Sequence, residues 1–294
     1  MTTLLQLILS GIMVGAIYAL VAIGVVLIFK STGIFNIAQG AILMLGAYIL
    51  FTFLVQFGWP LGLSLALALL SAVVVGYLIE RLALRPLIGQ APLAAFMVTL
   101  AMIGLLEGLI TLVWGTFGRR YPEFISPEPI HLGNLVLSQE YTWSFLIATV
   151  LIIALTFFFK YHRLGLAMRA VAEDHMVAQS TGISIKTAFS LSWIISTVVA
   201  TVGGILLAVS AGVTISLGSV GLKALPVVLL GGLESIPGAI VGGLIIGVLE
   251  TVAAGYIDPY VGGGVADIMP FIIMILILLI KPYGLFGQER IERI

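Results

Sequence analysis

The sequence contains no cysteine and very little charge. Its 294 residues include only 13 basic and 13 acidic side chains, and the formal net charge is zero. Without cysteine the chain can form neither disulfides nor thiolate metal sites. A balanced charge gives no electrostatic basis for binding nucleic acid. Because 61% of the residues are hydrophobic and only 9% are charged, an ordinary soluble domain is excluded and a membrane protein is indicated.

Motifs for nucleotide, metal and nucleophile chemistry are also missing. A P-loop needs a glycine followed by lysine, and none of the five lysines follows a glycine. No HExxH motif occurs, and the three histidines fall in different expected loops, so no metal site is expected. Fragments at 62–64 and 182–184 leave an intramembrane serine hydrolase as a minor alternative, but no histidine lies in an apolar run to act as its base. We therefore expect a chain that is not an enzyme and binds no cofactor itself.

Long apolar runs dominate what is present. A helix needs about 20 such residues to cross a bilayer, and eight runs approach or exceed that length. They cover residues 4–29, 36–57, 61–79, 92–114, 142–159, 187–211, 236–254 and 264–280. The first run is too long for a signal peptide and is expected to be retained as a helix. The expected fold class is an all-α, polytopic helical membrane protein, with residues 1–294 forming a single transmembrane domain.

Lysine and arginine predict the orientation, because cytoplasmic loops are enriched in them. An outside N-terminus places the following basic residues inside: Lys30, Arg81, Arg85, Lys160, Arg163, Arg169 and Lys186. Only Arg119 and Arg120 then lie outside, and the opposite orientation reverses this balance. We therefore expect an outer loop at about 115–141 and a cytoplasmic loop at about 160–186.

The stretch 212–235 is needed to complete the topology. Eight crossings from an outside N-terminus would leave the basic tail, with Lys281, Arg290 and Arg293, on the outside. One more crossing brings this tail inside, and 212–235 is the unassigned candidate. The stretch is broken by glycines, Lys223 and Pro226, so we expect a broken or re-entrant segment that crosses or half-crosses. Irregular backbone at membrane depth is tolerated where it is buried in protein or lines a cavity, which makes this stretch a candidate pathway wall.

Two polar groups are candidates for a pathway or gate. Asn36 and Gln39, followed by Gly40, open the second run and share one helix face. They either line a pore or bond across helices. The other candidates lie in the broken stretch: Lys223, Gly231, Gly232, Glu234 and Ser235. Lys223 and Glu234 could pair, and residues 231–235 are typical of a re-entrant turn. The glycines of 238–247 have small-xxx-small spacing, which predicts close helix packing.

Glu107 and Glu250 are carboxylates inside apolar runs. Such a charge is costly in a bilayer and calls for a reason. Each is either a proton relay, as in an ion-coupled carrier, or a carboxylate bonded to its neighbours near the interface.

The segment 166–182 is expected to form a short amphipathic helix that ends at Gly182. One stripe carries Leu166, Ala170, Val177 and Thr181, with Ala167, Val171 and Ala178 beside it, and polar residues occupy the rest. Helices that lie in the membrane interface favour basic polar faces, whereas this one carries Glu173 and Asp174. A solvated connector and a helix docked in another protein's groove both remain open on composition.

Four segments together resemble a known family. The first is Leu164-Gly165-x-Ala167-Met168-Arg169-Ala170-x-Ala172-Glu173-Asp174, followed by Ala178 and Gly182. The others are 35–48 (FNIAQG…LGAY), 221–239 (GLKA…LGGxxSIPGA) and 281–287 (KPYGLFG). In this order and over nearly the whole length, they resemble the branched-chain amino acid ABC transporter permease family (the LivH-type subunit). Gln39 departs from the pattern, since many relatives have histidine there.

The resemblance implies an ATP-driven importer of several chains in a bacterial or archaeal cytoplasmic membrane. Its partners would be two cytoplasmic ABC ATPase subunits, which bind ATP and magnesium, a second permease subunit, and an extracytoplasmic substrate-binding protein. Residues 166–182 would be the coupling helix. Its contact and shape positions would be Arg169, Ala172, Glu173, Asp174, Ala178 and Gly182.

The substrate class expected from the resemblance is hydrophobic, branched-chain amino acids: Leu, Ile and Val. Permeases for urea or short amides look similar and are the alternative within the family. An ion-coupled secondary transporter is the alternative from another class.

Overall fold

The computed structural model describes residues 2–126, 128–133, 135–173 and 175–287. The long helices are α1 (Thr2–Thr32), α2 (Gln39–Phe51), α3 (Leu61–Leu78), α4 (Pro92–Trp114), α5 (Gln139–Tyr161), α8 (Ile185–Ala211), α11 (Ile236–Tyr256) and α13 (Val265–Ile280). The shorter elements are η1 (Thr52–Gln56), η2 (Ile79–Leu84), η3 (Arg85–Leu87), β1 (Ile130–Leu132), β2 (Leu135–Leu137), α6 (Arg163–Glu173), α7 (His175–Ser180), α9 (Leu217–Leu222), α10 (Ala224–Gly231) and α12 (Asp258–Val261). The expected all-α membrane fold is confirmed: within the described ranges, seven helical segments are long and apolar enough to cross a membrane.

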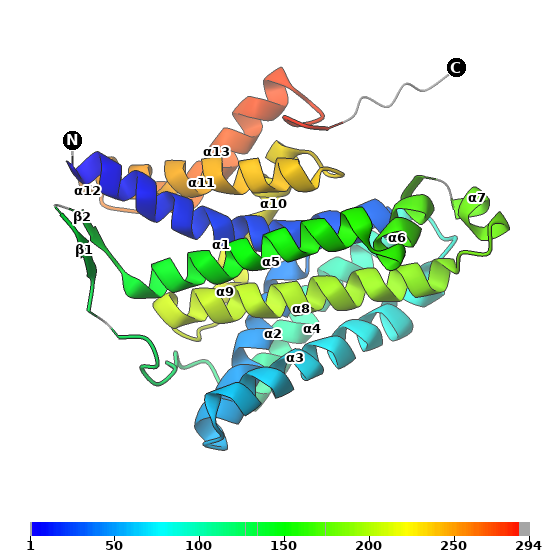
Figure 1. The fold of residues 1–294 in the computed structure, drawn as a ribbon, viewed down its shortest axis with the longest axis horizontal. Coiled ribbons are helices and arrows are strands. Elements are labelled where there is room, and N and C mark those ends of the chain that lie inside the picture. Colours follow the sequence, from blue (N-terminus) through cyan, green and yellow to red (C-terminus); the bar gives the residue numbers. More distant parts are fainter. Residues whose placement is uncertain (1, 127, 134, 174, 288–294) are drawn as a thin grey trace.

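Helix α1 lies at the centre of the bundle, with α5, α8 and α11 packed along it (Figure 1). Nearly every side chain of α1 from Gly15 to Ile28 is buried. Helices α3, α4 and α5 instead expose large apolar side chains on their outer faces, such as Leu70, Leu112 and Val150. Exposing these side chains has no free-energy cost on a lipid-facing helix, because lipid tails are as apolar as leucine.

Glycines set the distance between α1 and α11. A methyl group placed on Gly15 would lie 2.6 Å from the carbonyl oxygen of Gly243, and one placed on Gly11 would lie 2.8 Å from that of Gly247. The two backbones therefore touch, which only small residues allow. The close packing predicted from the spacing of the glycines in 238–247 is confirmed.

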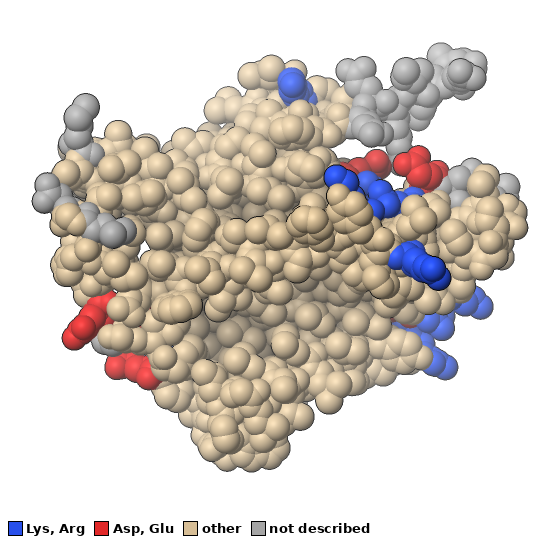
Figure 2. Space-filling view, viewed as in Figure 1, with Lys and Arg blue, Asp and Glu red and all other residues tan. Residues whose placement is uncertain are grey.

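The two ends of the bundle are distinct. The hairpin of β1 and β2 lies at the start of α1, where the amide of Gln6 donates to the carbonyl of Val136. This is called the hairpin end. The opposite end, called the Lys30 end, carries the last turn of α1 together with α6 and α7, and lysine and arginine side chains gather there (Figures 1 and 2). This clustering fits the predicted cytoplasmic position of the Lys30 end.

Residues 212–235 pass from one end of the bundle to the other. Helix α8 runs antiparallel to α1, since Gly24 meets Ser196 while Val21 meets Gly203, so α8 ends at the hairpin end. Helix α11 is also antiparallel to α1 and begins at the Lys30 end. The connection through α9 and α10 therefore crosses the bundle and is not re-entrant. The extra crossing inferred from the basic tail is confirmed.

Helix α13 makes the last pass. It starts close to the hairpin end and is followed by a turn in which the N–H of Leu285 donates to the carbonyl of Leu230, at the end of α10. Residue 287 thus lies at the Lys30 end, opposite the start of α1. Arg290 and Arg293, which the orientation argument used, lie outside the described residues, and the assignment of inside and outside stays a prediction.

The outer loop is tied down at the hairpin end. Arg119 and Val213 exchange two backbone hydrogen bonds, so the loop is fastened to the start of the 212–235 crossing. The hydroxyl of Tyr121 donates to the carbonyl of Ala47 in α2. Burial raises the pKa of Tyr121, because the phenolate form would lose its hydration, and the neutral phenol stays a donor.

The described residues of the expected amphipathic helix over 166–182 are helical up to Ser180, in α6 and α7. Asp174, between these two segments, lies outside the described residues. Within the expected apolar stripe, Leu166 and Val177 are about 60% exposed. Val171 and Ala178, expected beside the stripe, are buried against the bundle together with Met168. The predicted stop is confirmed, since Gly182 has a φ of +84° just after α7.

Candidate functional site

The first polar site is the amide junction, formed by Asn36, Gln39 and Ser196. The Nδ2 of Asn36 donates to the Oε1 of Gln39 at 3.0 Å, and the Oγ of Ser196 donates to the same oxygen at 3.2 Å. The Nε2 of Gln39 donates to the carbonyl of Ser196 at 3.4 Å. All three side chains are buried. Buried amides need such partners, since an unpaired polar group costs about 1–3 kcal/mol.

The amide junction fixes where α2 begins. The Oδ1 of Asn36 accepts from the backbone N–H of Ala38, which turns the chain into α2. Gly24 of α1 leaves the space for the Gln39 amide, and Gly40 packs directly on Gly221 of α9. The junction therefore joins α1, α2 and α8, and α9 packs beside it. This geometry supports the structural alternative, and a pore-lining role for Asn36, Gln39 and Gly40 stays a prediction.

The second polar site is the ion cluster of Lys223, Glu250 and Asp267. The Nζ of Lys223 lies 2.6 Å from the Oε1 of Glu250 and 2.8 Å from the Oδ1 of Asp267. The hydroxyl of Tyr18 donates to the same oxygen of Glu250 at 3.2 Å. Lys223 lies between α9 and α10, so the cluster ties the broken crossing to α1, α11 and α13.

The ion cluster corrects the pairing expected for Lys223 and shows the partners of the Glu250 carboxylate. The sequence suggested Glu234 as a partner of Lys223. In the structure Lys223 pairs with Glu250 and Asp267 instead. Glu250 is bonded to its neighbours, with a cation as one partner, which agrees with the second alternative given above; the proton-relay alternative is not tested by this contact. Its other oxygen, Oε2, is buried and has no hydrogen-bond partner in the described part of the chain. The cluster carries two carboxylates for one ammonium group, which leaves a buried acceptor available to a proton or another cation.

A third polar site, missed from the sequence, lies where η2 meets α8. Glu80 is buried, and Arg85 binds both of its carboxylate oxygens, at 2.9 and 2.8 Å. The hydroxyl of Ser190 lies 2.8 Å from the same carboxylate and 2.9 Å from Arg85. The spacing of five residues matches the π-helical turn of η2, whereas an α-helix brings together residues three or four apart. The i, i+5 spacing gave no sequence signal because the π-turn was not expected.

The proposed coupling residues occupy different environments. Glu173 is exposed, Ala172 is half-buried and Ala178 is buried. Arg169 turns its guanidinium toward α1 and donates to the carbonyl of Lys160 at 3.2 Å. Near Glu173 and Ala178, the exposed surface carries three apolar side chains: Leu164, Leu166 and Val177. The coupling role of these residues stays a prediction.

The turn between α10 and α11 is built for close packing. Gly231 lies against Gly238, and Gly232, with a φ of +105°, lies against Gly287. The Oγ of Ser235 caps α11 by accepting from the N–H of Gly238 at 3.0 Å. The turn reverses the chain between two antiparallel helices at the Lys30 end, so the expected re-entrant geometry is wrong. A pathway role for Gly231, Gly232, Glu234 and Ser235 stays a prediction.

These features define the class of protein. A bundle with a broken crossing, buried polar junctions between helices and a charge cluster beside the break is a multi-pass membrane protein of the transporter type. Among the described residues, no group of histidine, aspartate and glutamate side chains is arranged to hold a metal ion.

Comparisons with known proteins identify the family. Residues 7–278 match the family described as "Branched-chain amino acid transport system / permease component". The chain is 31% identical to the high-affinity branched-chain amino acid transport system permease protein LivH of Escherichia coli K12, over 99% of this chain and 97% of that protein. It is 32% identical to BraD of Pseudomonas aeruginosa, over 99% and 98%. A probable LivH of Methanocaldococcus jannaschii is 30% identical, over 97% and 93%.

The chain therefore belongs to the branched-chain amino acid transport permease family. The family resemblance noted in the sequence is confirmed. Among solved structures, PsaBC from Streptococcus pneumoniae, in complex with Fab, has a similar fold, with a TM-score of 0.52, 14% identity and coverage of 96% of this chain and 92% of that one. At this identity the likeness concerns the fold alone.

Proposed function

We propose that this chain is the membrane-spanning permease subunit of an ATP-driven importer and that it moves branched-chain amino acids (Leu, Ile and Val) across the cytoplasmic membrane. The observation that carries the proposal is the match to named branched-chain amino acid permeases over nearly the full length of both chains. The absence of a P-loop from the whole sequence agrees with it, because ATP and magnesium would then bind on a partner.

The partners follow from the same proposal. The importer would have two cytoplasmic ATPase subunits, and one of them would dock at the Lys30 end of this chain, on the exposed side of α6 and α7. Leu166 and Val177 would supply apolar contact and Glu173 a charge. A second permease subunit, identical or related, would complete the pathway. A substrate-binding protein would deliver the amino acid at the hairpin end.

Uptake in cells tests the function. A strain lacking its own branched-chain amino acid uptake would receive this chain together with the ATPase, second permease and binding-protein genes that accompany it. We expect labelled leucine to accumulate, to require ATP and to persist when an uncoupler removes the proton gradient. Accumulation that follows the proton gradient would instead show an ion-coupled carrier, and uptake of labelled urea or acetamide without leucine would show the alternative substrate class.

A variant pair tests the docking surface. The double substitution Glu173→Lys and Leu166→Asp changes only exposed side chains of α6. It should abolish both uptake and co-purification of the ATPase while leaving the permease in the membrane. The matched control is Val136→Asp, which changes an exposed apolar side chain at the opposite end and should keep ATPase binding. If the double variant still binds the ATPase, the docking surface is wrong even though the transport function could stand.

A further inference from the structure

One side of the ion cluster is not covered by the chain. The side chain of Asp267 is 78% exposed, whereas those of Lys223 and Glu250 are largely buried. The Oδ1 of Asp267 accepts from the Nζ of Lys223 at 2.8 Å, while its Oδ2 accepts no hydrogen bond from the described residues. The ammonium of Lys223 donates to Glu250 and Asp267, which leaves one of its N–H groups without a partner in the described part of the chain. The cluster therefore has a spare carboxylate oxygen and a spare ammonium N–H next to each other.

The exposed carboxylate of Asp267 lies at membrane depth. Glu250 lies well inside α11 and accepts from Tyr18, which is in the middle of the 31-residue helix α1. Because Asp267 binds the same ammonium as Glu250, it lies at this level of the bundle. A charge exposed to lipid tails at such a depth is costly, so intramembrane carboxylates face a water-filled cavity or other protein. This side of the cluster is therefore not a lipid-facing surface.

The neighbouring side chains extend this surface on both helices. Ser219, whose side chain is exposed, lies one turn before Lys223 on the same face of the broken crossing. Phe271 lies one turn after Asp267 on the same face of α13 and is also exposed. The surface thus combines a charged pair, a hydroxyl group and an aromatic ring. We call these four residues the charge-pair site.

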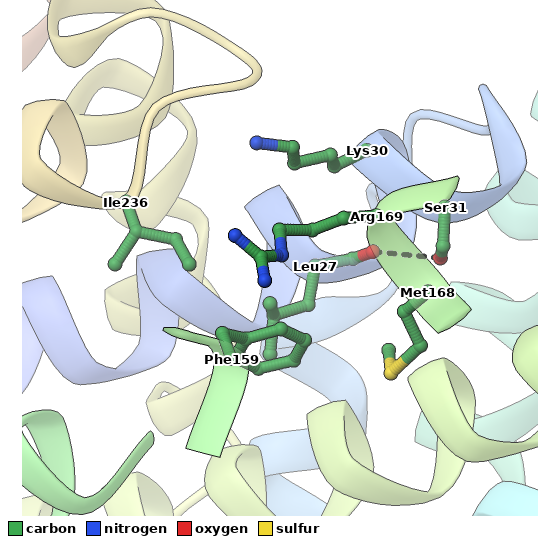
Figure 3. A pocket seen from close by; sticks show the side chains of 7 residues that line it. All are labelled: Leu27, Lys30, Ser31, Phe159, Met168, Arg169 and Ile236. Carbon is green, nitrogen blue, oxygen red and sulfur yellow. Dashed lines mark hydrogen bonds between the residues drawn. The ribbon is translucent and has the colours of Figure 1, made fainter. Parts of the chain in front are cut away.

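The two signs of charge select the kind of molecule that fits. A free amino acid carries its ammonium and its carboxylate on one carbon atom, so it can bind Asp267 and Lys223 at the same time. A ligand of a single charge would meet a like charge in the pair. A second copy of this chain would need a cation at the same depth. In the described part of the chain, however, the other lysines and arginines lie toward the ends of the bundle, as Lys30 and Arg169 do in Figure 3.

We propose that the charge-pair site holds the zwitterionic backbone of an amino acid during its passage through the membrane. The substrate ammonium binds the Oδ2 of Asp267, and the substrate carboxylate accepts from the spare N–H of Lys223, both as charge-assisted hydrogen bonds. An apolar substrate side chain lies against Phe271. The inference rests on the proposed import of branched-chain amino acids and adds the residues that hold the substrate.

Uptake by the complete importer in proteoliposomes tests the site. The wild type and Asp267→Asn would each be assembled with the ATPase subunits, the second permease and the binding protein. We expect Asp267→Asn to lower the maximal rate of leucine uptake about 10-fold, because a charge-assisted hydrogen bond to the substrate ammonium is lost. The KM for leucine and the rate of ATP hydrolysis should stay unchanged, because the binding protein selects the substrate and an exposed pair contributes little to the fold.

Two further variants serve as controls for the uptake assay. Asp267→Glu keeps the charge and should retain most of the uptake. Glu140→Gln removes a carboxylate from the first turn of α5, as Asp267→Asn does from the first turn of α13, and should transport as the wild type does. An equal loss in Glu140→Gln would overturn the proposal in favour of a general effect of charge at a helix start.

Binding of small probes tests the recognition of both charges directly. Saturation-transfer NMR of the assembled permease pair in detergent would compare leucine with isocaproate, which lacks the ammonium, and with isoamylamine, which lacks the carboxylate. We expect saturation transfer to leucine, much less to either analogue, and a loss of the leucine signal in Asp267→Asn. Equal transfer to leucine and isocaproate would overturn the role of Asp267.

The remaining outcomes separate this site from the proposed function. If the wild type takes up leucine and Asp267→Asn takes it up equally well, the charge-pair site is wrong and the proposed function stands. If the wild type takes up no leucine, the proposed function itself fails. If Asp267→Asn separates the two permease chains in size-exclusion chromatography, Asp267 faces a partner chain and the substrate assignment is overturned.

Discussion

The ammonium of Lys223 lies 2.6 Å from the carboxylate of Glu250, although 27 residues separate them in the chain. Both side chains are largely buried, with exposed fractions of 9% and 14%. The contact joins the break between α9 and α10 to α11. It holds the broken crossing against the helix that follows it.

Removing one charge of this pair should destabilise the protein. Lys223→Met leaves Glu250 buried without its cation, and breaking a buried pair costs about 3–5 kcal/mol. The midpoint of thermal unfolding in detergent, followed by scanning fluorimetry, should therefore fall. The double variant Lys223→Met and Glu250→Gln should recover part of the loss, because no buried charge is left unpaired.

Asp267 provides the control for this pair. It binds the same ammonium, but its side chain is 78% exposed. Because exposed pairs contribute about 0–1 kcal/mol, Asp267→Asn should leave the unfolding midpoint nearly unchanged. An equal loss for Asp267→Asn and Lys223→Met would contradict the assignment of Glu250 as the principal partner.

The glycine contact between α1 and α11 should not tolerate a side chain. Gly15→Leu places a branched side chain where a methyl group already lies 2.6 Å from a backbone oxygen of Gly243. We expect the helices to separate and the purified protein to aggregate in size-exclusion chromatography. Gly104→Leu is the matched control, because nothing lies within 4 Å of a methyl group at that position of α4. It should elute as the wild type does.

The amide junction should tolerate no apolar replacement of Gln39. Gln39→Leu removes the acceptor of both Asn36 and Ser196 and leaves these buried donors unpaired, at a cost of about 1–3 kcal/mol each. The unfolding midpoint should fall, and hydrogen exchange at the start of α2 should quicken. Gln56→Leu is the control, since this glutamine is exposed and should respond little. Unchanged exchange in Gln39→Leu would show that the junction does not fix α2.

The contact between η2 and α8 should depend on the shape of the arginine. Arg85→Lys keeps the charge but cannot bind both oxygens of Glu80, because an ammonium group lacks the planar fork of guanidinium. We expect a lower unfolding midpoint and faster proteolysis at the start of α8. Arg81→Lys is the control, since Arg81 is exposed and takes no part in this pair. Equal stability of the two variants would mean that the two-oxygen contact contributes little.

Much of the fold could be read from local patterns. The runs of apolar residues correspond to helices, and the placement of Lys and Arg required a crossing through 212–235 that the structure contains. Glu80 and Arg85 were missed because their contact depends on a π-turn. Lys223 was paired with Glu234, a neighbour along the chain, because Glu250 and Asp267 become neighbours only when α11 and α13 pack. Val171 is buried, as its place beside the apolar stripe suggested, whereas the burial of Met168 depends on how α6 packs against the rest of the bundle.

The sequence by itself determined that this chain spans a membrane many times and belongs to its family, because apolar length and ordered motifs are properties of the chain alone. The tertiary structure decided which polar side chains meet. A buried charge or amide takes whichever partner the packed helices bring within about 3 Å, and that distance depends on helix contacts, such as those of Gly15 with Gly243, between residues far apart in the sequence.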